Sequence, residues 1–317
     1  MNSEQSFIPM KSLSIRSYLG PKVLAFVIFA FSFSSHSSCI YHSPRTGEVQ
    51  EQFPETVLII GHRGTKALAP ENTMSAFRLA TKYGHGFELD TMQCKSGELV
   101  VIHDYNLERV TGVKKDVKET SLQEIKDLDA GSRFSPKFKG EKIPTLEEVL
   151  DEFGGKAVID IEIKSKESGE AAQKLADEVV SLLQKKKFPK RTFVSSFNPK
   201  ILERIKEKKP ELIRAQIYGT FKDSDIEYYK KVVLRNLLLN KRAVPDILAP
   251  EKVLVDEKYI REYHALGYKI LPWTVNDPEE MKKLLKAKVD GLITDRPDLF
   301  AKIVEEETQS NRKGTEK

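Results

Sequence analysis

Residues 57–64 read Val-Leu-Ile-Ile-Gly-His-Arg-Gly, and this stretch decides which fold the chain adopts. Its first four residues are apolar and mostly β-branched, which is typical of a strand buried on both faces, as in a parallel sheet. The strand then ends directly in two ionisable side chains, His62 and Arg63. We therefore expect a buried parallel sheet whose strands end in polar residues.

Strand-like and helical segments alternate along the rest of the chain. Further strands are expected at 86–90, 99–103, 157–163, 192–196, 213–218, 246–249, 269–274 and 291–294. Helices are expected from a cap at 72 or 73 to 83, and at 146–153, 170–187, 199–208, 223–239, 256–266 and 278–286. This alternation predicts an α/β protein with a closed (β/α)8 TIM barrel, which typically takes about 250 residues. A doubly wound open sheet is the alternative, although no glycine-rich nucleotide-binding turn supports it.

One interval breaks the alternation. The segment between Asp90 and Leu99 is too short for a helical crossover, which normally takes a dozen or more residues. Lys95-Ser96-Gly97 is a plausible tight turn instead. If the two flanking strands fold back on each other, His103 comes to lie beside Glu88 and Asp90.

Composition excludes several classes of protein. The 317 residues are 39% hydrophobic and 31% charged, as expected of a folded globular chain rather than a disordered or fibrous one. The net charge of +5 is spread over 52 basic and 47 acidic residues, which is no footprint for nucleic-acid binding. Two cysteines exclude a disulfide scaffold and an all-cysteine metal site. A mean hydropathy of -0.42 excludes a multi-span membrane protein.

The N-terminal region is typical of an export signal. Three basic residues and one acid precede an apolar run that begins at Val23, and at about eleven residues it is shorter than the ~20 of a membrane span. Small residues then lead to Cys39, so we expect residues 1–38 to form a signal peptide of the lipoprotein type, with Cys39 lipidated. His36 stands where that motif usually has a leucine-like residue, and ordinary cleavage near Ser38 or an uncleaved anchor are the alternatives. Each implies export, and a lipoprotein would face the periplasm or the cell surface.

The remaining boundaries follow from the same patterns. Residues 39–55 are polar and without periodicity, as expected of a tether. The folded domain is expected at 56–304 and a frayed polar tail at 305–317.

Charged pairs at the strand ends indicate chemistry. Glu88 and Asp90 share one face of their strand, as do Glu162 and Lys164 of theirs. Alternating charges often mark only the wet face of a strand, but these interrupt runs that should be buried on both faces. In a barrel the carboxyl ends of the strands converge on one rim, where active sites lie.

These residue types together suggest phosphoryl transfer. Three carboxylates without a cysteine cluster favour a hard cation, Ca²⁺ or Mg²⁺, over Zn²⁺. His62 and His103 suit general acid–base catalysis near neutral pH. Arg63 and Lys164 could hold a phosphate.

The ordered set of motifs resembles the glycerophosphodiester phosphodiesterase family. The resemblance begins with the His-Arg-Gly strand end and runs to about residue 300, essentially the whole folded domain. The motifs that carry it are Gly61-His62-Arg63-Gly64, Ala69-Pro70-Glu71-Asn72-Thr73, Phe87-Glu88-Leu89-Asp90, Val100-Val101-Ile102-His103-Asp104, Ile161-Glu162-Ile163-Lys164, Trp273-Thr274-Val275-Asn276 and Asp290-Gly291-Leu292-Ile293-Thr294-Asp295.

The resemblance implies a TIM barrel with a small insertion after the His-Asp strand, at about 105–142. The implied site has catalytic His62 and His103, a divalent cation on Glu88, Asp90 and Glu162, phosphate contacts from Arg63 and Lys164, and a pocket lined by Trp273 and Asn276. Glu71 is expected to orient Arg63 rather than to touch metal.

The implied reaction is metal-dependent hydrolysis of glycerophosphodiesters to an alcohol and sn-glycerol 3-phosphate. We expect His62 to be the base and His103 the acid. The alternatives are a lysophospholipase D-type activity on membrane lysolipids and a non-enzymatic binding lipoprotein on the same barrel. The expected partners are a small-molecule substrate and, through the anchor, a membrane.

Overall fold

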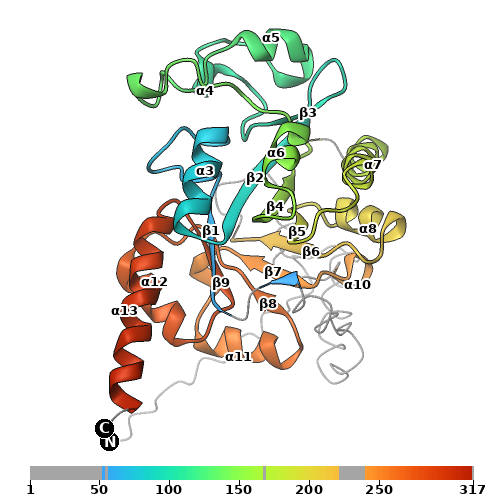
Figure 1. Ribbon diagram of the computed structural model, residues 1–317. Coiled ribbons are helices and arrows are strands. Elements are labelled where there is room, and N and C mark those ends of the chain that lie inside the picture. Colours follow the sequence, from blue (N-terminus) through green and yellow to red (C-terminus); the bar gives the residue numbers. More distant parts are fainter. Residues whose placement is uncertain (1–51, 54–55, 167–168, 221–239, 316–317) are drawn as a thin grey trace, which may run out of the picture. The chain divides into compact units, whose positions relative to one another are not determined.

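The computed structural model describes residues 52–53, 56–166, 169–220 and 240–315 (Figure 1). Three expectations lie outside these residues: the signal peptide with Cys39, almost all of the tether, and the helix at 223–239.

Eight parallel strands form a nearly closed barrel, and this confirms the predicted fold (Figure 1). Their order around the sheet is β8, β7, β6, β5, β4, β2, β1, β9. The strands are β1 (Leu58–Gly61), β2 (Gly86–Gln93), β4 (Val158–Ile163), β5 (Thr192–Ser196), β6 (Arg214–Tyr218), β7 (Ile247–Pro250), β8 (Lys269–Ile270) and β9 (Gly291–Thr294).

Strand β8 is shorter than the expected 269–274, because Pro272 has no N–H to contribute to a ladder. The carbonyl of Pro272 instead accepts a hydrogen bond of 3.0 Å from the Ile293 N–H. The Val275 N–H donates to the Ile293 carbonyl at 3.1 Å. These two bonds join the last strand to the segment after β8 and bring the edges of the sheet together.

Helices cover the outside of the barrel, with their starts set by capping side chains. Thr145 forms a capping box with Glu148, and Thr73, Asn198, Asp256 and Asp277 each accept a hydrogen bond from the first turn. The helices are α3 (Met74–Tyr83), α6 (Leu146–Phe153), α7 (Glu170–Lys185), α8 (Pro199–Lys208), α10 (Asn240–Ala243), α11 (Glu257–Ala265), α12 (Pro278–Lys286) and α13 (Pro297–Thr315).

The final helix corrects the expected tail. Helix α13 continues through residues 305–315 because no proline or glycine interrupts it before Gly314. Among the described residues, no helix combines the length and the apolar character needed to cross a membrane.

Each strand is buried on both faces, as the apolar runs predict. Leu58 and Ile60 of β1 point into the barrel, where they pack in one cluster with Phe193 and Ile247. Ile59 points outward and packs in a second cluster beneath the helices. The barrel interior is therefore filled with side chains, and a cavity can open only at its rim.

The predicted hairpin is present. Strand β3 (Leu99–Val101) runs antiparallel to β2, with Thr91 opposite Val101 and Gln93 opposite Leu99. The segment after it contains α4 (Glu108–Thr111), η4 (Val117–Glu119), α5 (Leu122–Asp127) and η5 (Pro136–Phe138), and it lies above the barrel in Figure 1. This insertion has a small core of its own around Leu107, Val117 and Ile125.

Candidate active site

A cavity of about 260 Å³ opens at the carboxyl ends of the strands. Most of the site residues that the sequence predicts meet there, although they come from strands and loops far apart in the chain. Among the residues that line it are His62, Arg63, Glu88, His103, Glu162, Lys164 and Trp273. Asp90 is buried beside them, at 1% exposure.

The Gly61–Gly64 turn requires glycine at its first and last positions. Arg63 has φ of 49° and Gly64 has φ of 86°. A Cβ on Gly61 would lie 1.8 Å from the Gly64 carbonyl oxygen, so a side chain there is impossible without moving the turn. The turn directs the Arg63 N–H onto Glu88 Oε2 at 2.8 Å.

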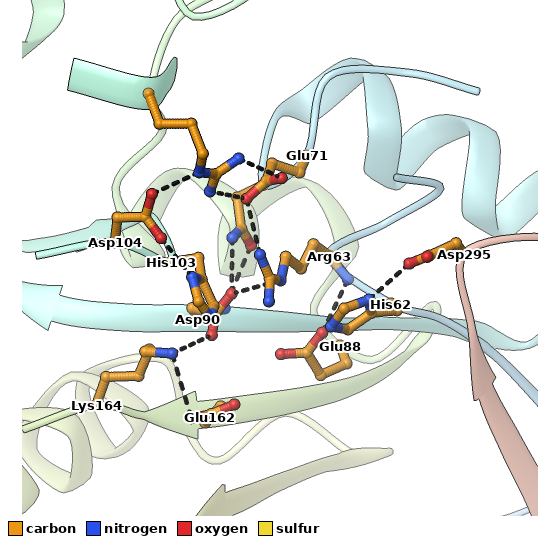
Figure 2. A network of polar contacts seen from close by, with 12 residues as sticks. His62, Arg63, Glu71, Glu88, Asp90, His103, Asp104, Glu162, Lys164 and Asp295 are labelled. Atoms are coloured by element: carbon orange, nitrogen blue, oxygen red, sulfur yellow. Dashed lines mark hydrogen bonds and ion pairs between the residues drawn. The ribbon is translucent and has the colours of Figure 1, made fainter. Parts of the chain in front are cut away.

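Three carboxylates form the predicted cluster. Glu88, Asp90 and Glu162 each offer one oxygen, and these oxygens lie within 4.8 Å of one another (Figure 2). Strand geometry explains the convergence, because Glu88 and Asp90 share a face of β2 and Asp90 stands opposite Glu162 of β4.

The charges of this cluster are unevenly compensated. Asp90 lies 3.3 Å from Lys164 Nζ and 3.4 Å from Arg63 Nε, and it accepts a hydrogen bond of 2.8 Å from Asn72. These contacts outweigh burial and hold the pKa of Asp90 well below its usual range. Burial and the neighbouring carboxylates instead raise the pKa of Glu88 well above normal, and burial is the main cause that raises the pKa of Glu162 to about 7.

A hard divalent cation fits this donor set. Burial, together with the charges of neighbouring carboxylates, raises the pKa of both Glu88 and Glu162, so a cation bound to their oxygens would favour the ionised form of each. Carboxylate oxygens are the ligands that Ca²⁺ and Mg²⁺ prefer. The geometry therefore provides a candidate metal site on Glu88, Asp90 and Glu162.

Each histidine is paired with its own aspartate. His62 Nδ1 lies 2.6 Å from Asp295 Oδ1, and His103 Nδ1 lies 2.6 Å from Asp104 Oδ1 (Figure 2). An aspartate at Nδ1 favours the tautomer that keeps the proton there and leaves Nε2 available for proton transfer. The two pairs lie on opposite sides of the carboxylate cluster in Figure 2.

The environment of His103 acts on its pKa in both directions. Burial lowers this pKa, and the charges of Asp90 and Asp104 partly oppose the effect. The pKa of Asp104 falls to about 2, because its hydrogen bonds to Arg109 and His103 outweigh its burial. A lowered pKa favours the neutral form of His103. Because a general acid must carry its proton before it can donate it, His103 can act as an acid only at a correspondingly lower pH.

Glu71 orients Arg63, as expected. Its Oε1 accepts a hydrogen bond of 3.0 Å from Arg63 Nη1. The same carboxylate accepts two hydrogen bonds from Arg109, whose Nε reaches Asp104 at 2.5 Å. This network joins the Arg63 guanidinium to the pair formed by Asp104 and His103.

The two residues predicted to line the pocket behave differently. Trp273 does line the cavity, and it also packs edge to face on Phe197 and donates from Nε1 to the Ala249 carbonyl at 2.8 Å. Asn276 is exposed and does not line the cavity; its Nδ2 donates to Asp295 Oδ2 at 2.7 Å. The structure thus places Asn276 against Asp295, from whose backbone N–H it also accepts a hydrogen bond of 2.9 Å, rather than in the wall of the cavity.

Sequence reasoning missed the roles of several polar partners. Asp104 and Asp295 stand directly after strand-like runs, which is the signal that identified the other site residues. Asn72 is predicted as a candidate helix cap, and in the structure its Nδ2 donates a hydrogen bond to Asp90 Oδ2 at 2.8 Å. Asp160 also lines the cavity, and burial raises its pKa to about 8. Nothing in the sequence links Arg109, which lies in the insertion, to Glu71.

Comparisons with known proteins show the family to which the chain belongs. Residues 62–299 match the model of the glycerophosphoryl diester phosphodiesterase family. A glycerophosphodiester phosphodiesterase of Caldanaerobacter subterraneus subsp. tengcongensis is 36% identical over 249 residues, which cover 78% of this chain and 97% of that protein.

Solved structures show the same barrel. A glycerophosphodiester phosphodiesterase of Thermotoga maritima superposes with a TM-score of 0.61 at 28% identity, over 79% of this chain and all of that one. A phosphodiesterase of Oleispira antarctica, solved with the product sn-glycerol-3-phosphate, has a TM-score of 0.66 at 27% identity, over 78% and 96% of the two chains. The chain therefore belongs to the glycerophosphoryl diester phosphodiesterase family.

Proposed function

We propose that this protein hydrolyses glycerophosphodiesters to an alcohol and sn-glycerol 3-phosphate. The observation that carries the proposal is the pair of aspartate-bound histidines, His62 and His103, at a single cavity. Two cationic side chains and the cluster of three carboxylates lie at the same cavity. Family membership supports it, as does the product complex of the Oleispira antarctica relative.

The carboxylate cluster is proposed to hold Ca²⁺ or Mg²⁺. Glu88, Asp90 and Glu162 would supply the oxygens, and the bound cation would neutralise charge on the phosphoryl group. Arg63 and Lys164 contribute positive charge at the same place, so the phosphate of the substrate is expected between these side chains and the histidines.

Each histidine has one role in the proton transfers of the first step. His62 Nε2 takes the proton of the attacking oxygen, which is the substrate's own 2-hydroxyl, as that oxygen bonds to phosphorus. The bond from phosphorus to the leaving alcohol breaks, and His103 Nε2 donates a proton to the departing oxygen. A cyclic phosphate remains, and water opens it with the two roles reversed.

The aspartates act through these histidines. Asp295 and Asp104 hold the Nδ1 proton of their partners and stabilise each imidazolium when it forms. Asn276 acts one step further out, because it fixes the Asp295 carboxylate.

The test is turnover of glycerophosphocholine by the purified protein, with release of sn-glycerol 3-phosphate as the readout. Activity is expected with Mg²⁺ or Ca²⁺ and should be lost in excess chelator, while His62→Ala serves as the inactive control. Full activity in chelator would remove the metal from the mechanism. Turnover of lysolipids but not of glycerophosphocholine would favour a lysophospholipase D-type enzyme, and no turnover at all would favour a binding protein.

We further propose that the protein is exported and anchored to a membrane by a lipid on Cys39. The basic start, the short apolar run and the small residues before Cys39 support this proposal. The catalytic domain would then work at the periplasmic or outer side of that membrane.

A further inference from the structure

A second hollow adjoins the catalytic cavity. It has a volume of about 320 Å³, within the range of small-molecule sites, and lies between the insertion, the end of β2 and the loop that leads into α7. Lys164 lines both the hollow and the cavity. The two spaces therefore border the same side chain, which we expect to contact the phosphate.

The hollow lies on the His103 side of the site. Tyr105, which follows His103 by two residues, forms part of its wall. Tyr105 lines the hollow together with Lys164, whose Nζ lies 3.3 Å from Asp90 and 3.7 Å from Glu162, so this wall stands beside the carboxylate cluster. An alcohol that receives its proton from His103 would leave in this direction.

Among the described residues, the lining of the hollow carries more positive than negative charge. It includes Lys164, which contacts Asp90 and Glu162, and also three exposed lysines and one aspartate. The lysines are Lys95, Lys118 and Lys166. The Asp116 carboxylate accepts a hydrogen bond of 2.9 Å from the Asn106 amide. Apolar side chains such as Val117 and Leu175 complete the wall and would suit a short carbon skeleton.

The aromatic ring in this hollow is already covered by a cation. Lys166 Nζ lies 4.6 Å from the centroid of the Tyr105 ring. A quaternary ammonium group is normally recognised by stacking on such a ring. Here Lys166 occupies that position, and its charge would repel a second cation.

We propose that this hollow receives the leaving alcohol and that its lysines select leaving groups carrying an anionic substituent, a carboxylate or a second phosphate, over cationic ones. The inference rests on the proposed function. It adds selectivity for the leaving group, which the catalytic residues alone do not provide.

The sharpest test compares two substrates that differ by one carboxylate. Glycerophosphoserine carries this group and glycerophosphoethanolamine lacks it, while the rest of the two molecules is the same. We expect kcat/KM to favour the serine ester by about two- to fivefold, the effect of a partly exposed ion pair worth up to about 1 kcal/mol. Lys118→Glu and Lys166→Glu should each bring the ratio to about one or below, because they replace attraction by repulsion.

A matched control separates local recognition from overall charge. Lys139 is an exposed lysine of the same insertion that does not line the hollow, so Lys139→Glu should keep the wild-type ratio. Equal turnover of both esters by the wild type, or a ratio that Lys118→Glu and Lys166→Glu leave unchanged, would overturn this inference and leave the proposed hydrolysis intact. No turnover of either ester would refute the proposed function and the inference with it.

Discussion

Replacing Asp104 by asparagine should reveal which step His103 performs. Asp104 Oδ1 lies 2.6 Å from His103 Nδ1, and the two side chains are 29% and 31% exposed. The substitution removes a negative charge that stabilises the imidazolium but keeps an oxygen that can accept the Nδ1 proton. The tautomer is therefore preserved while the pKa of His103 falls.

The size of the effect follows from the surroundings. Two unit charges about 4 Å apart near a protein surface interact by about 4 kcal/mol at an effective dielectric constant of 20. Arg109 already binds the other oxygen of Asp104 at 2.5 Å, and the side chains of Asp104 and His103 both contact solvent. The interaction between Asp104 and the imidazolium of His103 is therefore only part of this energy. We expect a loss of about 1.4 kcal/mol, which lowers the pKa of His103 by about one unit.

The assay is the pH dependence of kcat/KM for glycerophosphocholine. An acid must be protonated to act, so a lower pKa should move the falling, alkaline limb of the bell about one pH unit toward acid. The rising limb should stay in place. With a nitrophenyl ester of glycerol 3-phosphate, whose leaving group needs no proton, the falling limb should disappear in both proteins.

A shift of the rising limb alone would refute this assignment and make His103 the base. If neither limb moves while the variant remains folded, His103 takes no part in the titrating step. Asp298→Asn is a suitable control, because it removes a charge from an aspartate that pairs with Arg296 outside the cavity.

Three further predictions concern the histidines, the cation site and the N-terminal region. Removing either histidine should lower the rate by about 10²–10⁴-fold, and a nitrophenyl ester should rescue His103→Ala but not His62→Ala; rescue of His62→Ala alone would reverse the roles. In metal-free protein the raised pKa of Glu162, about 7 against an ordinary 4.5, means that the folded chain holds a proton which the unfolded chain has released, so the Tm should fall as pH rises through this interval. Adding Mg²⁺ or Ca²⁺ should remove this fall in Tm, and Glu162→Gln should reduce it. A dependence of Tm on pH that is the same with and without the cation would contradict the proposed cation site. Intact mass of the native protein should show a chain that begins at a lipid-modified Cys39, and any other start would contradict lipidation.

Local patterns in the sequence were sufficient to predict most of the strands and helices. The expected strands and helices from Val57 to residue 300 lie close to their predicted positions in the described residues, because burial on two faces leaves an unmistakable apolar run. The hairpin was predictable from length alone, since eight residues cannot hold a helical crossover. Two predicted boundaries were wrong for local reasons: Pro272 ends β8 early, and α13 extends because no helix breaker interrupts it before Gly314.

The sequence by itself determined which side chains stand at the strand ends, because alternation along a strand and the common direction of parallel strands assign each residue to a face and a rim. Only the tertiary structure decided how they pair. His62 and Asp295 are 233 residues apart and meet because β1 and β9 are neighbours in the barrel. Arg109 reaches Glu71 only because the insertion folds over the rim, and the lysine-lined hollow forms from three segments that share no motif. Contacts of this kind depend on strand order and loop packing, which a local pattern of residues does not encode.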